Sequence, residues 1–293
     1  PLSNFENMTV LQANNTNISS LKPLENKKKL KIIYCDNSKI DINEANNFMD
    51  ENPGCLVIYN SQELEKWWQD LSMEWRNLFK QEYNISDSVS VEKLHELIQE
   101  RRISVAFNKQ IYDIKPLSIM HRLNEVYLQG TSISDLTPIS GLSNIEELNI
   151  SNTEIISLEP LSSLRRIRII KLENTRIDNL SSLESASLRI IYCDNTLVRE
   201  GEALRFKNTH PKTVVIYQSD NLRMWWNNLD DSWKDEFIGM LKLPLSPSNM
   251  DLQNMVDTES IQVIDNPSIL NLNPLHKFLR LKELVINSTS ITD

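Results

Sequence analysis

Hydrophobic residues in this chain recur with a period of 22 residues. The repeat that begins at Pro138 places them at Leu142, Ile145, Leu148, Ile150, Ile155 and Leu158. Two apolar residues separated by one polar residue, as at Leu148 and Ile150, predict a short β-strand with one buried face. A repeat of this length indicates a stack of similar coils rather than a closed globule.

Proline marks the start of the clearest repeats. These repeats cover residues 1–22, 116–137, 138–159 and 160–181. A proline suits a corner between coils because its φ angle is fixed and it has no N–H group to leave unpaired. The repeats therefore carry both a strand signal and a turn signal at constant spacing.

A longer repeat spans most of the chain. Shifting the sequence by 158 residues aligns residues 30–135 with 188–293 without a gap. The Ile-Tyr-Cys-Asp-Asn run at 33–37 then meets the same run at 191–195, and the Trp-Trp pair at 67–68 meets the pair at 225–226. Both repeats predict a solenoid in which each coil buries the hydrophobic edge of its neighbours.

The short repeat resembles a leucine-rich repeat of the 22-residue, internalin-like type, Pro-Leu-x-x-Leu-x-x-Leu-x-x-Leu-x-Leu-x-Asn-Thr-x-Ile-x-x-Leu. One repeat matches this motif at Pro160, Leu161, Leu164, Ile167, Ile170, Leu172, Asn174, Thr175, Ile177 and Leu180. The resemblance implies an α/β fold, a curved leucine-rich-repeat solenoid with a parallel sheet on its concave side. One strand per coil gives about eleven short strands, near residues 11, 33, 57, 104, 126, 148, 170, 191, 215, 262 and 284.

The resemblance also implies a ladder of asparagines at the turns after the strands. Its expected members are Asn37, Asn108, Asn152, Asn174, Asn195 and Asn266. An asparagine suits this place because its side chain can hydrogen-bond the backbone of a tight bend. Gly130 and Ser288 depart from the ladder.

Two coils are much longer than 22 residues, and both extra segments are rich in tryptophan. In the first, helical spacing of Leu, Trp and Phe predicts a helix that starts at a capping Ser61. Its residues Trp67, Leu71, Trp75 and Phe79 are four apart, which predicts one stripe buried against the stack. A second helix is expected over 91–101. Because the sheet is expected to continue, the helices should leave by the convex side.

These features predict a single leucine-rich-repeat solenoid over residues 1–293. Its expected segments are repeats at 1–60, a tryptophan-helix insert at 61–102, repeats at 103–218, a second insert at 219–260 and repeats at 261–293. The parent chain is expected to continue beyond both ends, because Pro1 and Asp293 fall within the repeat lattice and the second long repeat is incomplete.

Composition and charge narrow the class of partner. Hydrophobic residues make up 40% of the chain and charged residues 24%, as in a folded soluble protein. The net charge of −9 argues against a nucleic-acid partner, because proteins that bind nucleic acid usually present a basic face. No apolar stretch approaches the roughly 20 residues of a membrane span.

The cysteines and the resemblance point to different compartments. Cys35, Cys55 and Cys193 form no disulfide framework and are expected to be small buried apolar residues. Unpaired thiols favour a reducing interior. The internalin-like resemblance favours a cell-surface or secreted protein, so the sequence leaves the compartment open.

The sequence contains no catalytic constellation, and we expect a non-enzymatic protein without a cofactor. Its five glycines are not grouped into a phosphate-binding loop. No serine lies in a nucleophile-elbow motif. The four histidines have no metal-ligand spacing, so no metal site is expected; they are His95, His121, His210 and His276.

Side chains between the buried strand positions are expected to face a partner on the concave side. The candidates are Tyr34, Asp36, Tyr127, Gln129, Asn149, Lys171, Glu173, Tyr192 and Asp194, and Ile32 and Ile190 can extend the patch. The three tyrosines are favoured in interfaces, although tyrosine also favours strands for other reasons. Near residue 104 the inward set is either Ser104 and Ala106 or the alternating residues Ile103, Val105 and Phe107.

The predicted function is a non-enzymatic protein-binding module that uses the concave face for a protein of unknown identity. The alternative is a carbohydrate-binding or surface-adhesion module with exposed aromatic rings. Its secondary candidates are Trp68 and Trp226, which lie about 100° around the helix from the preceding tryptophans. Exposed Trp68 and Trp226 rings would favour glycan stacking, and buried rings a protein partner. A purely structural spacer would have no apolar patch on the concave face.

Overall fold

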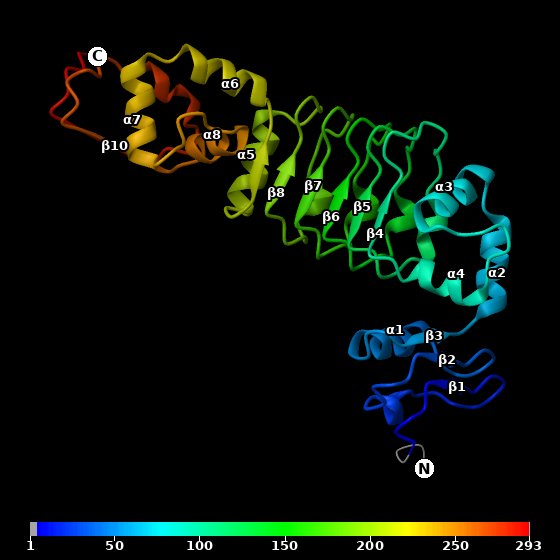
Figure 1. The fold of residues 1–293 in the computed structure, drawn as a ribbon. Helices are drawn as coiled ribbons and strands as arrows, with labels where there is room; N and C mark the ends of the chain where they lie inside the picture. Colours follow the sequence, from blue (N-terminus) through cyan, green and yellow to red (C-terminus); the bar gives the residue numbers. More distant parts are fainter. Residues whose placement is uncertain (1–4, 293) are drawn as a thin grey trace.

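The computed structural model describes residues 5–292, which form successive coils with one strand per coil (Figure 1). Pro1 and Asp293 lie outside the described residues. The strands are β1 (Val10–Gln12), β2 (Ile32–Tyr34), β3 (Leu56–Ile58), β4 (Arg102–Ser104), β5 (Glu125–Tyr127), β6 (Glu147–Asn149), β7 (Ile169–Lys171), β8 (Ile190–Tyr192), β9 (Val214–Ile216), β10 (Ser260–Ile264) and β11 (Glu283–Asn287). The predicted set of about eleven strands is confirmed.

All strand pairs in residues 5–292 are parallel, but the strands form three sheets rather than one. The sheets are β1–β3, β4–β9 and β10–β11. In the central sheet, Val126 pairs with Leu148 and Leu148 with Ile170, which is the 22-residue period. The expectation of a sheet that continues past the inserts is wrong, because β3 does not pair with β4 nor β9 with β10. The single-domain organisation stays a prediction.

Helices fill the places where the sheet is interrupted. They are α1 (Ile42–Glu51), α2 (Ser61–Asp70), α3 (Met73–Tyr83), α4 (Val91–Ile98), α5 (Glu200–Thr209), α6 (Ser219–Asn228), α7 (Asp231–Leu241) and α8 (Asn249–Val256). Helix α4 packs on β3 and on α2, and α8 packs on β9 and on α6. A helix therefore occupies the side of β3 and of β9 at which the next strand would otherwise pair.

Short 3₁₀ turns form the corners opposite the strands. They are η2 (Lys22–Leu24), η3 (Lys115–Ile119), η4 (Thr137–Ile139), η5 (Glu159–Leu161), η6 (Ser181–Leu183) and η7 (Asn273–Lys277). All but η6 contain proline in the first turn, as the fixed φ of proline predicts.

The repeat positions form the hydrophobic core. Leu148 and Ile150 are fully buried, as the strand pattern predicts. One cluster of buried residues runs from Leu64 on α2 to Val215 on β9 and so joins the first insert to the central sheet. Separate clusters lie under β1–β3 and between α6 and the last coil. The cores are thus divided in a similar way to the sheets.

Each strand is followed by one residue with a left-handed backbone. These residues are Asn15, Asn37, Asn60, Phe107, Gly130, Asn152, Asn174, Asn195, Gln218, Asp265 and Ser288. Four predicted ladder members have this conformation, namely Asn37, Asn152, Asn174 and Asn195. The other two, Asn108 and Asn266, each lie one residue after the left-handed residue of their turn. Gly130 and Ser288 keep the ladder conformation although they lack an amide side chain, so the turn depends on the backbone and not on asparagine alone.

The tryptophan segment is two helices and not the single helix that its spacing predicts. Leu71 ends α2 in an extended conformation, and the Ser72 side chain accepts a hydrogen bond from the Trp75 N–H to start α3. The chain turns at this point, so the four-residue spacing does not describe one continuous stripe. Trp68 is buried, while Trp67 is only half-buried, against the same core.

Candidate protein-binding surface

The central sheet has one face turned away from its core, where the concave face is expected. Strand register aligns its side chains in two rows. The first row is Arg102, Glu125, Glu147, Ile169, Ile190 and Val214, and the second is Ser104, Tyr127, Asn149, Lys171, Tyr192 and Ile216. Ile216 is buried, so the accessible part of the second row ends at Tyr192. Ile103 and Val105 are buried, so the strand near 104 follows the same alternation as its neighbours.

The end of this face over β4 and β5 is charged. The Arg102 guanidinium lies 4.8 Å from the centre of the Tyr127 ring and 3.8 Å from the Glu125 carboxylate. The Tyr127 hydroxyl donates to Glu125 over 3.1 Å. Desolvation, reinforced by this bond, raises the pKa of Tyr127 to about 12. Arg102, Glu125 and Tyr127 therefore form one linked polar group.

The end over β7 to β9 is apolar. Ile169 and Val214 are half-buried in the first row, and Ile190 between them is 9% exposed. Tyr192 lies beside them, and the Lys171 ammonium is 5.8 Å from the centre of its ring. Lys171 also lies 3.6 Å from Glu147. The apolar side chains thus adjoin a charged border, an arrangement common in protein interfaces.

Two other predicted residues, Asn149 and Glu173, are engaged in contacts within the sheet face or its turns. Asn149 accepts a hydrogen bond from the Ser151 N–H over 3.0 Å, and the Ser151 hydroxyl donates to Glu173 over 2.5 Å. The Gln129 side-chain oxygen is buried without a hydrogen-bond partner in the described chain. Asn149 and Glu173 are therefore held in place by their neighbours.

Asp36 and Asp194, predicted as binding residues, instead have a structural role. Asp194 accepts hydrogen bonds from the Ser219 N–H over 2.7 Å and from the Ser219 hydroxyl over 2.5 Å. Asp36 makes the same two bonds to Ser61, over 2.8 and 2.7 Å. Each aspartate therefore caps the helix that begins 25 residues further along the chain.

Tyr34 lies apart from the other candidates. It belongs to the β1–β3 sheet, and its hydroxyl donates to Glu92 of α4 over 2.8 Å. This bond raises the pKa of Tyr34 because it stabilises the neutral hydroxyl beside a carboxylate. The structure therefore brings together the candidates from 127 to 194 and leaves Tyr34 and Asp36 on a different sheet.

The secondary candidates Trp68 and Trp226 are buried, with 8% and 5% of their surface exposed. Trp68 contacts the Phe79 ring at 6.4 Å between centres. The condition for glycan stacking, exposed rings at these two positions, is not met. Trp67 and Trp225, which were expected to be the buried ones, are half-buried instead.

Arg102, Ile169 and Val214 are not among the residues predicted for this face, and Ile190 is predicted only as an extension of the patch. Strand alternation predicts all of them, because each lies directly before a buried strand residue. Each therefore points to the same face as the outward residue two positions later. The predicted set lacks these residues because it takes only the outward positions that follow the buried residue at the middle of each strand.

Two classes of feature are absent from the described part of the chain. Residues 5–292 contain no group of three or more His, Cys, Asp or Glu side chains arranged to hold a metal ion. None of the helices in this range is both long and apolar enough to cross a membrane.

Comparisons with known proteins give matches in structure only. No protein-family model matches the chain, and no curated protein matches it in sequence. An internalin, InlF, from Listeria monocytogenes is 20% identical, with 73% of this chain and 56% of that chain covered and a TM-score of 0.37. The internalin InlC2 from the same organism is 16% identical, with 72% and 80% covered and a TM-score of 0.38.

A third similar structure is the leucine-rich-repeat protein LIC12759 from Leptospira interrogans. It is 16% identical, with 73% of this chain and 62% of that chain covered and a TM-score of 0.37. The chain therefore spans less than two thirds of the length of InlF and of LIC12759. The 22-residue register, the parallel strands and the left-handed turn after each strand give the described residues the fold of a leucine-rich-repeat solenoid, and the repeats resemble the internalin-like type.

Proposed function

We propose that the chain is a non-enzymatic protein-binding module and that its binding surface is the outward face of β4–β9. The observation that carries the proposal is the apolar group Ile169, Ile190 and Val214 beside Tyr192, bordered by the charged pair Lys171 and Glu147. Fixed strands hold these side chains, so a partner would meet a surface that is already ordered, which lowers the entropic cost of binding.

The expected partner is a folded protein with an apolar patch and charges of both signs around it. Tyrosine side chains at the centre of an interface often supply much of the binding energy, while charged borders set orientation. Tyr127 and Tyr192 are therefore the proposed anchors, with Lys171 between them. Asn149, Glu173 and Gln129 support the surface, and Asp36 and Asp194 are left out because both oxygens of each carboxylate cap a helix.

Site-specific photo-crosslinking tests this proposal. A benzophenone amino acid at Tyr192 should capture a discrete protein from the proteome of the source organism or its surroundings. The same probe at Arg176, an exposed residue outside the two rows, should not capture it. Ile169→Asp should abolish capture at position 192 without changing the far-UV circular dichroism. Equal capture at both positions, or capture unchanged by Ile169→Asp, would contradict the proposed surface.

A further inference from the structure

A polar cavity of about 470 Å³ lies between helix α1 and the loops that lead into strands β4 to β7. Figure 1 places α1 opposite one end of the central coils, across the angle between the first and second sheets. The walls come from α1, from residues 101, 122 and 124, from the loop at 141–144, and from Arg166. This volume is within the range of about 300–1,000 Å³ that is usual for small-molecule sites.

The cavity has a local excess of positive charge in an acidic protein. Three guanidinium groups line it, from Arg101, Arg122 and Arg166, against a single carboxylate, Asp50. Asp50 pairs with both Arg101, at 3.1 Å, and Arg122. Within residues 5–292, Arg166 has no carboxylate partner and bonds only the Asn144 side-chain oxygen, over 2.7 Å. Most of its five N–H donors are therefore free to bind an anion.

The same cavity contains two acceptors that lack donors. The side-chain oxygens of Asn46 and Asn124 are buried and have no hydrogen-bond partner in the described chain, and both residues line the cavity. A buried oxygen without a donor costs about 1–3 kcal/mol, so native proteins usually satisfy it with a solvent or ligand group. Because both oxygens are shielded from solvent, hydroxyl groups of a ligand would supply the two donors only after the asparagine side chains turn toward the cavity.

His121 also lines the cavity and adds little charge near neutral pH. Burial lowers the pKa of its imidazole, because the low-polarity surroundings disfavour the cation. The anion-binding capacity therefore depends on the guanidinium groups, which stay charged at every physiological pH.

The second copy of the internal repeat does not keep most of the residues that line this cavity. At +158, Asn46 is replaced by Leu204, Asp50 by Asn208, and Arg101 by Glu259. Glu259 lies 2.5 Å from Arg280, the counterpart of Arg122, and 2.9 Å from Lys282. In each copy one carboxylate therefore contacts two cations, Asp50 in the first copy and Glu259 in the second, but the carboxylate comes from a different position.

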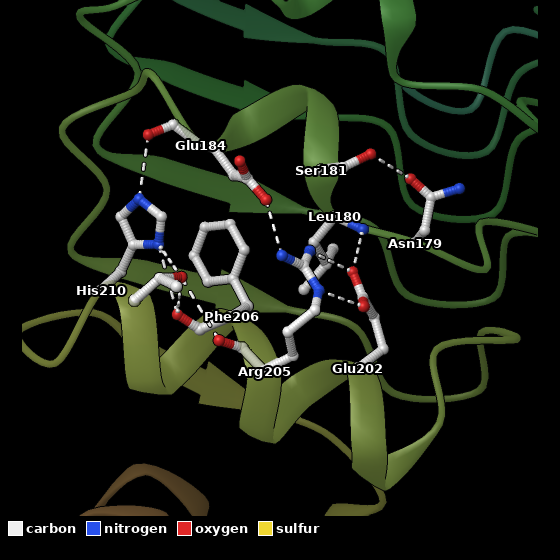
Figure 2. A network of polar contacts seen from close by, with 9 residues as sticks. Asn179, Leu180, Ser181, Glu184, Glu202, Arg205, Phe206 and His210 are labelled. Atoms are coloured by element: carbon white, nitrogen blue, oxygen red, sulfur yellow. Dashed lines mark hydrogen bonds and ion pairs between the residues drawn. The ribbon is translucent and has the colours of Figure 1, made fainter.

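Helix α5, the counterpart of α1, is also saturated on the face concerned. Figure 2 shows Arg205, which replaces Asn47, held between Glu202 and Glu184. His210 on the same helix contacts the Glu184 carbonyl over 2.9 Å. Arg205 and His210 therefore have partners within the second copy, whereas Asn46, Asn124 and Arg166 beside the first-copy cavity keep unused acceptors and donors.

We infer that this cavity binds a hydroxylated oxyanion of about the size of a sugar phosphate. The anionic group would lie against Arg166 with support from Arg101, and hydroxyl groups would donate to Asn46 and Asn124 once these side chains turn toward the cavity. Because α1 belongs to the first sheet unit and the arginines to the second, the ligand would also hold these two parts of the solenoid together. The same phosphate chemistry can come from a free sugar phosphate or from a phosphate-bearing polysaccharide.

Isothermal titration calorimetry with the whole chain tests the inference with four probes. These are glucose 6-phosphate, inorganic phosphate, glucose and a polysaccharide that carries phosphate monoesters. Glucose 6-phosphate should bind more tightly than inorganic phosphate, and glucose should not bind. A higher affinity, per phosphate group, for the free sugar phosphate or for the polymer identifies the source. Each sugar-bearing anion is titrated to about 10 mM, which is about ten times a weak Kd of 1 mM. The absence of any heat of binding from both of them would overturn the inference.

Two variants make the test specific. Arg166→Gln removes an exposed guanidinium without touching the core and should weaken glucose 6-phosphate binding at least about tenfold, as expected for a charge-assisted contact. Asn46→Leu installs the residue of the second copy and should weaken glucose 6-phosphate more than inorganic phosphate. Arg176→Gln, at an exposed site outside the cavity, is the matched control. Binding unchanged by Arg166→Gln, or weakened equally by the control, would show that the anion binds elsewhere.

Discussion

At the residue scale, the left-handed turn after each strand is the most regular feature of the chain. Asn37 donates from its side-chain amide to Asn15 over 3.1 Å, and Asn195 donates to Asn174 over 3.2 Å, so some rungs are linked directly. Asparagine and glycine adopt this conformation at low cost, whereas a bulky residue does not. Phe107, with φ of 61° and 73% of its surface exposed, is the one aromatic residue among the left-handed residues of the described chain.

Replacing Phe107 should stabilise the protein. Phe107→Asn supplies the residue that the ladder uses elsewhere and relieves a backbone conformation that costs a bulky residue about 1–3 kcal/mol. The exposed ring contributes little burial in return. We expect the free energy of unfolding in urea to rise by about 1 kcal/mol, after allowance for lost contact with Gly130. A fall of the same size would mean that the ring has a packing role.

Gly130 and Phe107 should be energetically coupled. A Cβ atom at Gly130 would lie 2.6 Å from the Phe107 ring, and its φ of 71° also disfavours a side chain. Gly130→Ala should therefore cost about 2 kcal/mol in the natural background and measurably less together with Phe107→Asn. Gly141→Ala, where no atom lies within 4 Å of the added carbon, is the control. Additive costs would contradict the contact.

The cysteines should be unreactive in the native state. Burial raises the pKa of Cys35 and of Cys55 to about 11, and it raises the pKa of Cys193 as well. Since the thiolate is the reactive form, a thiol reagent at pH 8 should modify all three rapidly in urea and very slowly without it. Folding stability from these groups is full below the pKa of a free thiol and decreases as the pH rises above it, because unfolding then releases protons. Rapid native-state labelling would contradict the buried positions.

At the scale of single elements, the sequence predicts strands better than helices. Leu148 and Ile150 identify a strand because alternation is a local property of the chain. The break between α2 and α3 was missed because Leu71 and Ser72 fit a helical pattern as well as they fit a junction. The caps at Asp36 and Asp194 could not be predicted, since each contacts a helix 25 residues away and local rules assign the cap to a neighbouring residue.

Removing one of these remote caps should loosen one helix. Asp194→Ala leaves the Ser219 N–H and hydroxyl without their acceptor and should lower the free energy of unfolding by about 1–2 kcal/mol. Hydrogen exchange should quicken at the start of α6 and stay unchanged at α2, which has its own cap from Asp36. Glu154→Ala, an exposed acid on the same solenoid, is the control. Unchanged exchange at α6 would show that Asp194 does not stabilise that helix.

At the scale of the whole molecule, the two junctions between sheet and insert are built differently. The Lys207 ammonium on α5 is buried, donates to the Thr213 carbonyl over 2.8 Å, and pairs with Asp257 after α8 at 3.0 Å. Residues at the corresponding places of the first copy are Met49 and Gln99. The first junction instead places His95 of α4, fully buried, against the Tyr59 backbone.

The repeat supplies a direct test of this ion pair. Lys207→Met alone leaves the Asp257 carboxylate without its cation and should lower the free energy of unfolding by about 3 kcal/mol. The double variant Lys207→Met with Asp257→Gln reproduces the first copy and should recover all but about 1 kcal/mol, since a neutral replacement of a buried pair is often tolerated. Chemical denaturation measures the free energy of unfolding of each variant. A double variant no more stable than the single variant would contradict this account.

The candidate surface could be predicted in part. Tyr127, Lys171 and Tyr192 follow from strand alternation, because the 22-residue register aligns them without further information. Tyr34 could not be separated from them, because the loss of pairing between β3 and β4 depends on how α4 packs. The anion cavity could not be predicted from the sequence either, because it lies between α1 and loops that are about 50 to 120 residues further along the chain.

The interruption of hydrogen bonding at α4 and α8 has a consequence for how the chain melts. In an uninterrupted repeat array, coupling between neighbours makes the array lose structure as a unit. In the described chain, two of the ten possible pairings between successive strands are missing, those of β3 with β4 and of β9 with β10. Packing of α4 and α8 replaces them. Calorimetry should therefore record separate heat-absorption peaks for blocks of coils, with cooperativity confined within each block.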